Sequence, residues 1–136
     1  MLKIGHRGAK GYVAENTLAS FQKALELDVD IIELDVHVSK DNIPVVIHDE
    51  TVDRTTNAKG KVTNFTAKEL QNLGIPILEE VFDLVENRCG INIEIKDFEA
   101  TKAVLNLINH YSFDTEKIII SSFDWNVLQL CHTEKP

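Results

Sequence analysis

The chain has 136 residues, of which 43% are hydrophobic and 26% are charged, and this is enough apolar material for the core of one globular domain. Its formal net charge of -8 argues against a protein that binds nucleic acid or an anionic membrane through a basic face. No apolar run approaches the roughly 20 residues that span a bilayer, so stable membrane insertion is not expected.

Apolar runs that predict strands alternate along the chain with segments of helical period. The predicted strands comprise residues 2–6, 31–38, 44–48, 91–96 and 117–122. The predicted helices comprise residues 17–27, 67–73, 78–86 and 99–111, and a last helix starts near Trp125. The polar, threonine-rich stretch of about residues 49–75 is interpreted as a small insertion within a single domain of residues 1–136.

This order of strands and helices predicts parallel strands joined by right-handed crossovers. In the strand of residues 31–38, Ile32 and Leu34 share one face. Glu33 and Asp35 share the other face, which turns polar toward the carboxyl end of the strand. A doubly wound sheet is apolar on both faces, whereas a (β/α) barrel gathers its functional residues at the carboxyl ends of several strands. The sequence therefore predicts an α/β fold of the TIM-barrel type, which stops after about the fifth strand.

Polar side chains at the strand ends form the candidate site. On a barrel they would converge on one mouth: His6, Glu33, Asp35, His48, Glu94 and Lys96. Arg7 adds a fixed cation directly after the proton carrier His6, just before a glycine turn. A proton carrier beside a fixed cation is what chemistry on a phosphate diester requires.

The three carboxylates of this set predict a metal site. At a separation of about 4 Å, each pair of like charges costs about 4 kcal/mol at an effective dielectric constant near 20. Such a cluster is stable only if a carboxylate takes up a proton or if a divalent cation lies at its centre. Oxygen ligands without paired Cys or His favour Ca²⁺ or Mg²⁺ over zinc. With the metal bound, Arg7 and Lys96 would complete a cationic pocket for a phosphate.

Several segments, in this order, resemble the glycerophosphodiester phosphodiesterase family: HRGAKGYVAENTLASFQKAL, DIIELDVHVSKDNIPVVIHDETVDRTTNAKGKV, PILEEVFDLV, INIEIK and IIISSFD. The resemblance runs from residue 2 to about residue 124 and is more specific than any single motif within it. It implies a metal-dependent TIM-barrel hydrolase. Such an enzyme cleaves small glycerophosphodiesters, such as glycerophosphocholine or glycerophosphoethanolamine, to glycerol 3-phosphate and an alcohol.

The resemblance also implies a role for each candidate residue. The catalytic histidines of the family fall on His6 and His48, which suggests that His6 acts as general base and His48 as general acid to the leaving alkoxide. The metal carboxylates of the family fall on Glu33, Asp35 and Glu94, and its phosphate-contacting cations fall on Arg7 and Lys96.

The chain departs from the family pattern in three places. Ala14 stands where the family usually has proline, and the loop between Leu73 and Ile75 looks shortened. Family members usually have eight strands, and this chain stops just after the fifth predicted strand. An open sheet leaves two bare edges and an uncovered inner face. We therefore expect a fragment of a longer chain, a barrel completed by self-association of its open edges, or a truncated product.

Two alternative functions stay open. A phospholipase C of the phosphatidylinositol type, or a lysophospholipase D, would use the same site on another diester. In a different class, the chain would be a catalytically inactive half-barrel that binds metal or serves in assembly.

Other polar residues and the cysteines have structural interpretations. Arg54 is expected to organise its loop, and His37 to support the neighbouring ligand pair. Cys89 and Cys131 have no Cys-x-x-Cys spacing, so both are expected to be reduced packing residues of a cytoplasmic protein. We expect no signal peptide, because the first residues lead directly into a strand.

Overall fold

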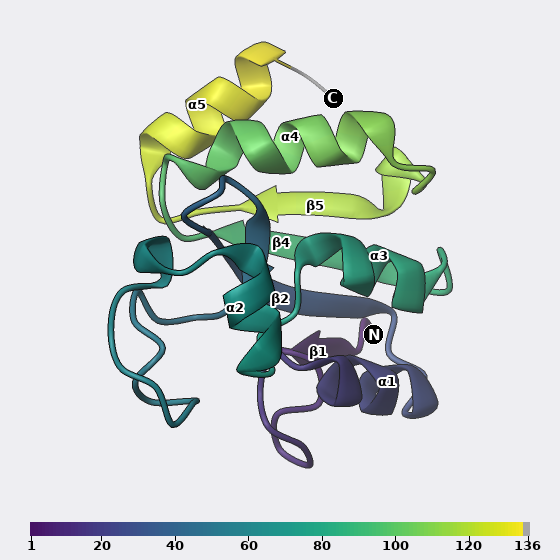
Figure 1. Ribbon diagram of the computed structural model, residues 1–136. Helices are drawn as coiled ribbons and strands as arrows, with labels where there is room; N and C mark the ends of the chain where they lie inside the picture. Colours follow the sequence, from purple (N-terminus) through teal and green to yellow (C-terminus); the bar gives the residue numbers. More distant parts are fainter. Residues whose placement is uncertain (135–136) are drawn as a thin grey trace.

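The structure is a computed structural model that describes residues 1–134, and it confirms the alternation of strands and helices (Figure 1). Its strands are β1 (Ile4–His6), β2 (Ile31–Val38), β3 (Pro44–Val46), β4 (Gly90–Ile95) and β5 (Ile118–Ser121). Its α-helices are α1 (Leu18–Glu26), α2 (Ala67–Asn72), α3 (Leu78–Val85), α4 (Ala100–His110) and α5 (Trp125–Glu134), and short 3-10 turns cover Val62–Asn64 and Thr115–Lys117. Among these helices, none is both long and apolar enough to cross a bilayer.

Four of the strands form a parallel sheet in the order β1-β2-β4-β5. The register pairs His6 of β1 with Glu33 of β2, and Asp35 of β2 with Glu94 of β4. Because the strands are parallel, their carboxyl ends meet at one edge of the sheet. This α/β arrangement is that of an open part of a (β/α) barrel, and it brings the predicted strand-end residues together.

The expectation that every strand pairs in parallel is wrong for β3. This strand lies off the main path and pairs antiparallel with the end of β2, with Val36 opposite Val46 and Val38 opposite Pro44. Only five residues separate β2 from β3, which is too short for the helical crossover that a parallel connection needs. The parallel sheet therefore has four strands, and β3 forms a hairpin at its end.

The aliphatic faces of the strands pack against helices, as the alternation predicted. Figure 1 shows α1, α3 and α4 on one side of the sheet. The main core between them contains the alternating residues of β2 and β4, all of which are buried: Ile32, Leu34, Val36, Val38, Ile91, Ile93 and Ile95. Burial of this aliphatic surface holds the strands in register, because a slip of one residue would turn these side chains toward the polar face.

The other face of the sheet carries the polar residues and is partly exposed. Ile4 of β1 and Ile119 of β5 retain 56% and 49% of their accessible surface, and both lie in the register rows of this face. In the part of the chain that the structure describes, β1 and β5 are the two edges of the parallel sheet. Backbone groups along both edges are therefore free to pair with further strands.

The predicted insertion builds a second, smaller core. Its buried members come from β3 and from the segment that follows: Val45, Ile47, Val52, Val62, Leu70 and Ile75. Within the segment, the Val52 N–H donates to the Gly60 carbonyl at 3.0 Å, and Thr66 caps the first turn of α2. The residues that follow β3 are thus held in place by this small core and by hydrogen bonds within the segment.

Gly8 fixes the turn between β1 and α1. Its φ is +82°, and a Cβ at this position would lie 2.4 Å from Ser20 Oγ and 2.8 Å from the Ser20 carbonyl carbon. Ser20 Oγ accepts from the Ala9 N–H at 2.8 Å and donates to the Arg7 carbonyl at 3.0 Å. The close packing of α1 on this turn therefore determines where His6 and Arg7 lie.

We expect Gly8→Ala to lower the free energy of unfolding by about 2 to 4 kcal/mol, because strain at positive φ adds to the overlap with Ser20. Gly11→Ala is the matched control, since its added Cβ would meet no atom within 4 Å. Urea denaturation measures both variants. Equal stability of the two would show that the turn does not depend on Gly8.

Candidate active site

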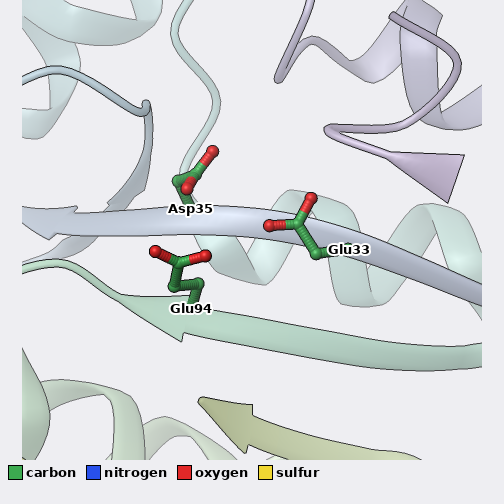
Figure 2. A group of neighbouring side chains, drawn as sticks. All are labelled: Glu33, Asp35 and Glu94. Carbon is green, nitrogen blue, oxygen red and sulfur yellow. The ribbon is translucent and has the colours of Figure 1, made fainter. Parts of the chain in front are cut away.

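Three carboxylates from two neighbouring strands form the centre of the site (Figure 2). Glu33 and Asp35 project from β2, and Glu94 projects from β4 opposite Asp35. Each offers an oxygen that lies within 4.8 Å of the oxygens of the other two. The sequence predicted this convergence, and the parallel register of β2 and β4 produces it.

The two predicted phosphate-contacting cations lie against these carboxylates. Lys96 Nζ is 2.8 Å from Glu94 Oε1 and 3.6 Å from Asp35 Oδ1. Arg7 Nε is 3.3 Å from Asp35 Oδ2. Asp35 is almost fully buried, so these cations stabilise a charge that would otherwise be costly to remove from water.

Glu33 is compensated less well than Asp35. Burial raises the pKa of the Glu33 carboxyl, a hydrogen bond of 2.8 Å from the Arg7 backbone N–H opposes the rise, and the charges of Asp35 and Glu94 add to it. Of the pKa shifts in this cluster, that of Glu33 is thus the one that favours uptake of a proton.

The donor set fits a divalent ion. All three side chains supply oxygen, which hard ions such as Ca²⁺ and Mg²⁺ prefer. Asn16, which is buried, donates through Nδ2 to Asp35 Oδ2 at 2.9 Å, and its Oδ1 has no hydrogen-bond partner among the described residues. An oxygen atom without a hydrogen-bond partner thus lies beside an acidic cluster whose negative charge is only partly balanced. The carboxylates of Glu33, Asp35 and Glu94 would hold the ion.

His6 lies beside the acidic cluster. It ends β1, its Nε2 is 3.8 Å from Glu33 Oε2, and its side chain is 54% exposed. Burial, followed by the charges of Lys10 and Arg7, lowers the pKa of His6 below its ordinary value of 6.5. The ring is therefore mainly neutral at pH 7 and can accept a proton.

The sequence had suggested that His48 ends a strand. In the structure it lies in the segment that follows β3. Its Nδ1 is 2.7 Å from Asp49 Oδ1. Its backbone carbonyl accepts a hydrogen bond from His37 Nε2 at 3.0 Å, and His37 Nδ1 lies 2.9 Å from Asp97 Oδ2. His37 therefore supports the backbone of the second histidine, whereas the sequence had suggested support for the carboxylate pair.

Sequence reasoning did not identify a chain of alternating charges between His48 and the acidic cluster. Arg54 donates to both Asp49 and Glu15, and Glu15 accepts from Arg7 Nη1 at 2.9 Å. The hydrogen bond from Arg54, followed by one from Arg7, lowers the pKa of Glu15 to about 2. Residues so far apart in sequence give no local cue that they are in contact. The one available signal for Glu15 and Arg54 was that each lies in one of the two longest segments that resemble the family.

Comparison with known proteins assigns the chain to a family. The model of the glycerophosphoryl diester phosphodiesterase family matches residues 6–136. A glycerophosphodiester phosphodiesterase of Caldanaerobacter subterraneus is 44% identical over 142 residues, which cover 90% of this chain and 58% of that protein.

Two solved structures show the same arrangement of the chain. The glycerophosphodiester phosphodiesterase of Thermotoga maritima is 40% identical, with a TM-score of 0.84 over 94% of this chain and 57% of that one. An Oleispira antarctica phosphodiesterase in complex with the product sn-glycerol-3-phosphate is 28% identical, with a TM-score of 0.90 over 100% of this chain and 63% of that one.

The chain thus spans between 57% and 63% of the length of these three relatives. The family match nevertheless covers every candidate site residue, from His6 to Lys96. The chain belongs to the glycerophosphoryl diester phosphodiesterase family.

Proposed function

We propose that this chain carries the catalytic residues of a metal-dependent phosphodiesterase that cleaves glycerophosphodiesters to glycerol 3-phosphate and an alcohol. The observation that carries the proposal is the convergence of three carboxylates beside His6, within a chain that belongs to this family. The product complex of the Oleispira antarctica relative supports this class of substrate.

The metal is proposed to be Ca²⁺ or Mg²⁺, held by Glu33, Asp35 and Glu94. When bound, the ion would orient the glycerol hydroxyls and offset charge on the phosphoryl oxygens. Arg7 and Lys96 lie against these carboxylates, which supports their proposed role as cations that contact the phosphate.

The two histidines are proposed to move the protons. His6, which is mainly neutral at pH 7, takes a proton from the attacking hydroxyl or water. His48, in its doubly protonated form, gives the Nε2 proton to the leaving alkoxide and keeps the Nδ1 proton, which Asp49 accepts in a hydrogen bond. A cavity of about 370 Å³ adjoins His48 and is large enough to receive a small alcohol.

We propose a cytoplasmic location on the basis of the cysteines. Cys89 and Cys131 are both free, and Cys89 is buried in the main core. Free packing cysteines are typical of proteins kept in a reducing compartment.

The hydrolysis of glycerophosphocholine tests the assignment of the histidines. We expect His6→Ala and His48→Ala each to reduce kcat by about 10²- to 10⁴-fold, because each removes one proton transfer. His110→Ala, at the exposed end of α4, is the control and is expected to keep full activity. Near-normal activity in either active-site variant would refute the assignment. A wild-type protein that binds metal without hydrolysis would instead favour the non-catalytic module.

Thermal unfolding with added Ca²⁺ or Mg²⁺ tests the metal site. At an ion concentration 100 times Kd, we expect Tm to rise by about 5 °C or more, because the ion binds only the folded chain. The rise should shrink as the pH falls, since burial raises the pKa of Glu33 and its proton competes with the ion. Asp35→Asn should abolish the rise, and the exposed Glu79→Gln should leave it unchanged. An equal rise in both variants would place the ion elsewhere.

We also propose that the open edges of the sheet support self-association. Two copies would bring together eight parallel strands, the number in a complete (β/α) barrel. Exposed apolar residues flank both edges: Leu2, Ile4, Ile119, Phe123 and Trp125. The net charge of -8 opposes the contact, so association should strengthen with salt.

Light scattering tests this self-association. We expect a mass near twice the chain mass of 15.3 kDa, and a return to the monomer in Ile119→Glu. Ile43→Glu, which changes an exposed residue between β2 and β3, should keep the wild-type mass. A wild-type mass of 15.3 kDa at high salt would contradict association.

A further inference from the structure

Arg54 joins two loops of the site that lie far apart in the sequence. Its Nη2 donates to Glu15 Oε1 at 2.7 Å and its Nη1 to Glu15 Oε2 at 3.2 Å, so the guanidinium holds both oxygens of that carboxylate. Its Nε donates to Asp49 Oδ2 at 2.8 Å and its Nη2 to Asp49 Oδ1 at 3.0 Å. One cation therefore holds two carboxylates, one in the β1–α1 loop and one in the segment after β3.

The contact with Asp49 bears directly on His48. Asp49 Oδ1 lies 2.7 Å from Nδ1 of the imidazole, and an ionised carboxylate can only accept a hydrogen bond. The hydrogen bonds from Arg54 make the largest contribution to holding the pKa of Asp49 below its usual range, so this carboxylate stays ionised. Asp49 therefore keeps a proton on Nδ1 in both the neutral and the doubly protonated ring, so Nε2 is the nitrogen that gains and loses a proton.

Removal of Arg54 would disturb this arrangement more than the loss of an ordinary surface ion pair. A single exposed pair contributes little to stability, and the Arg54 side chain is 49% exposed. Here, however, Asp49 and Glu15 share one guanidinium, so its loss leaves two neighbouring carboxylates that repel each other. Asp49 would then move away from Glu15, and its orientation toward His48 would be lost.

We propose that Arg54 is a positioning residue for His48: by holding Asp49 and Glu15 together, it keeps Asp49 against Nδ1 and leaves Nε2 to serve the leaving alcohol. The role of His48 as general acid rests on the proposed function, but the effect of Arg54 on the ring does not depend on it. Glu15 also accepts from Arg7, so the same guanidinium links the orientation of His48 to the cation beside Asp35.

Nitrogen NMR of the His48 ring tests the proposal without requiring activity. In the wild-type protein we expect the neutral ring to carry its proton on Nδ1, and in Arg54→Gln we expect a mixture with the Nε2-protonated form. Arg54→Lys should give an intermediate result, because a lysine cannot donate to both carboxylates in the same geometry. Lys61→Gln is the control, since it removes an exposed ion pair with Glu50 in the same segment and should leave the ring unchanged.

Kinetics with two leaving groups separates positioning from general damage. With an alkyl alcohol as leaving group, we expect Arg54→Gln to lower kcat by about 10- to 100-fold with little change in KM. With p-nitrophenol, which leaves without a proton, the loss should be within a few fold. A purely structural role would lower both rates equally.

Three outcomes would overturn the proposal. The first is a folded Arg54→Gln protein with the wild-type ring tautomer, and the second is an equal loss of rate with both leaving groups. The third applies if the glutamine variant does not fold: a folded Arg54→Lys protein that matches wild type in both measurements. If the wild-type chain shows no hydrolysis, the proposed function fails, and the ring tautomer alone still decides the role of Arg54.

Discussion

The repulsion among three carboxylates on one face of a sheet is the constraint on which the rest of the site depends. Asp35 lies between two cations, Lys96 lies against Glu94, and Glu33 has its pKa raised by burial. Two cations balance three acids only in part. The partial compensation lets the chain fold with the three carboxylates together and leaves excess negative charge. A divalent ion that prefers oxygen ligands would balance this charge.

This balance of charges depends on the backbone conformation of Arg7, which directly follows β1. Arg7 itself has a positive φ of 53°, and Gly8 packs against Ser20 of α1 with no room for a side chain. The backbone N–H of Arg7 then reaches Glu33 while its guanidinium reaches Asp35 and Glu15. Packing of α1 on the sheet, which is driven by apolar burial, therefore also sets the electrostatics of the site.

The two faces of the sheet have different roles: one packs the core and the other carries the candidate site. The aliphatic face buries β2 and β4 under α1, α3 and α4 and supplies most of the core. The polar face carries the candidate site and leaves Ile4 and Ile119 about half exposed, beside two edge strands. The candidate site therefore lies on the face that contributes least to the main core.

The sequence by itself determined the order of elements, the aliphatic and polar faces, and the meeting of Glu33, Asp35 and Glu94. Alternation follows from local periodicity, and the helical segments between β1, β2, β4 and β5 imply parallel pairing. It did not determine the antiparallel hairpin of β3, since strand direction depends on the length and packing of the connection. It also did not determine the contacts of Arg54 with Asp49 and Glu15. Residues 39 positions apart meet only when two loops pack together, so tertiary structure alone decided how His48 is held.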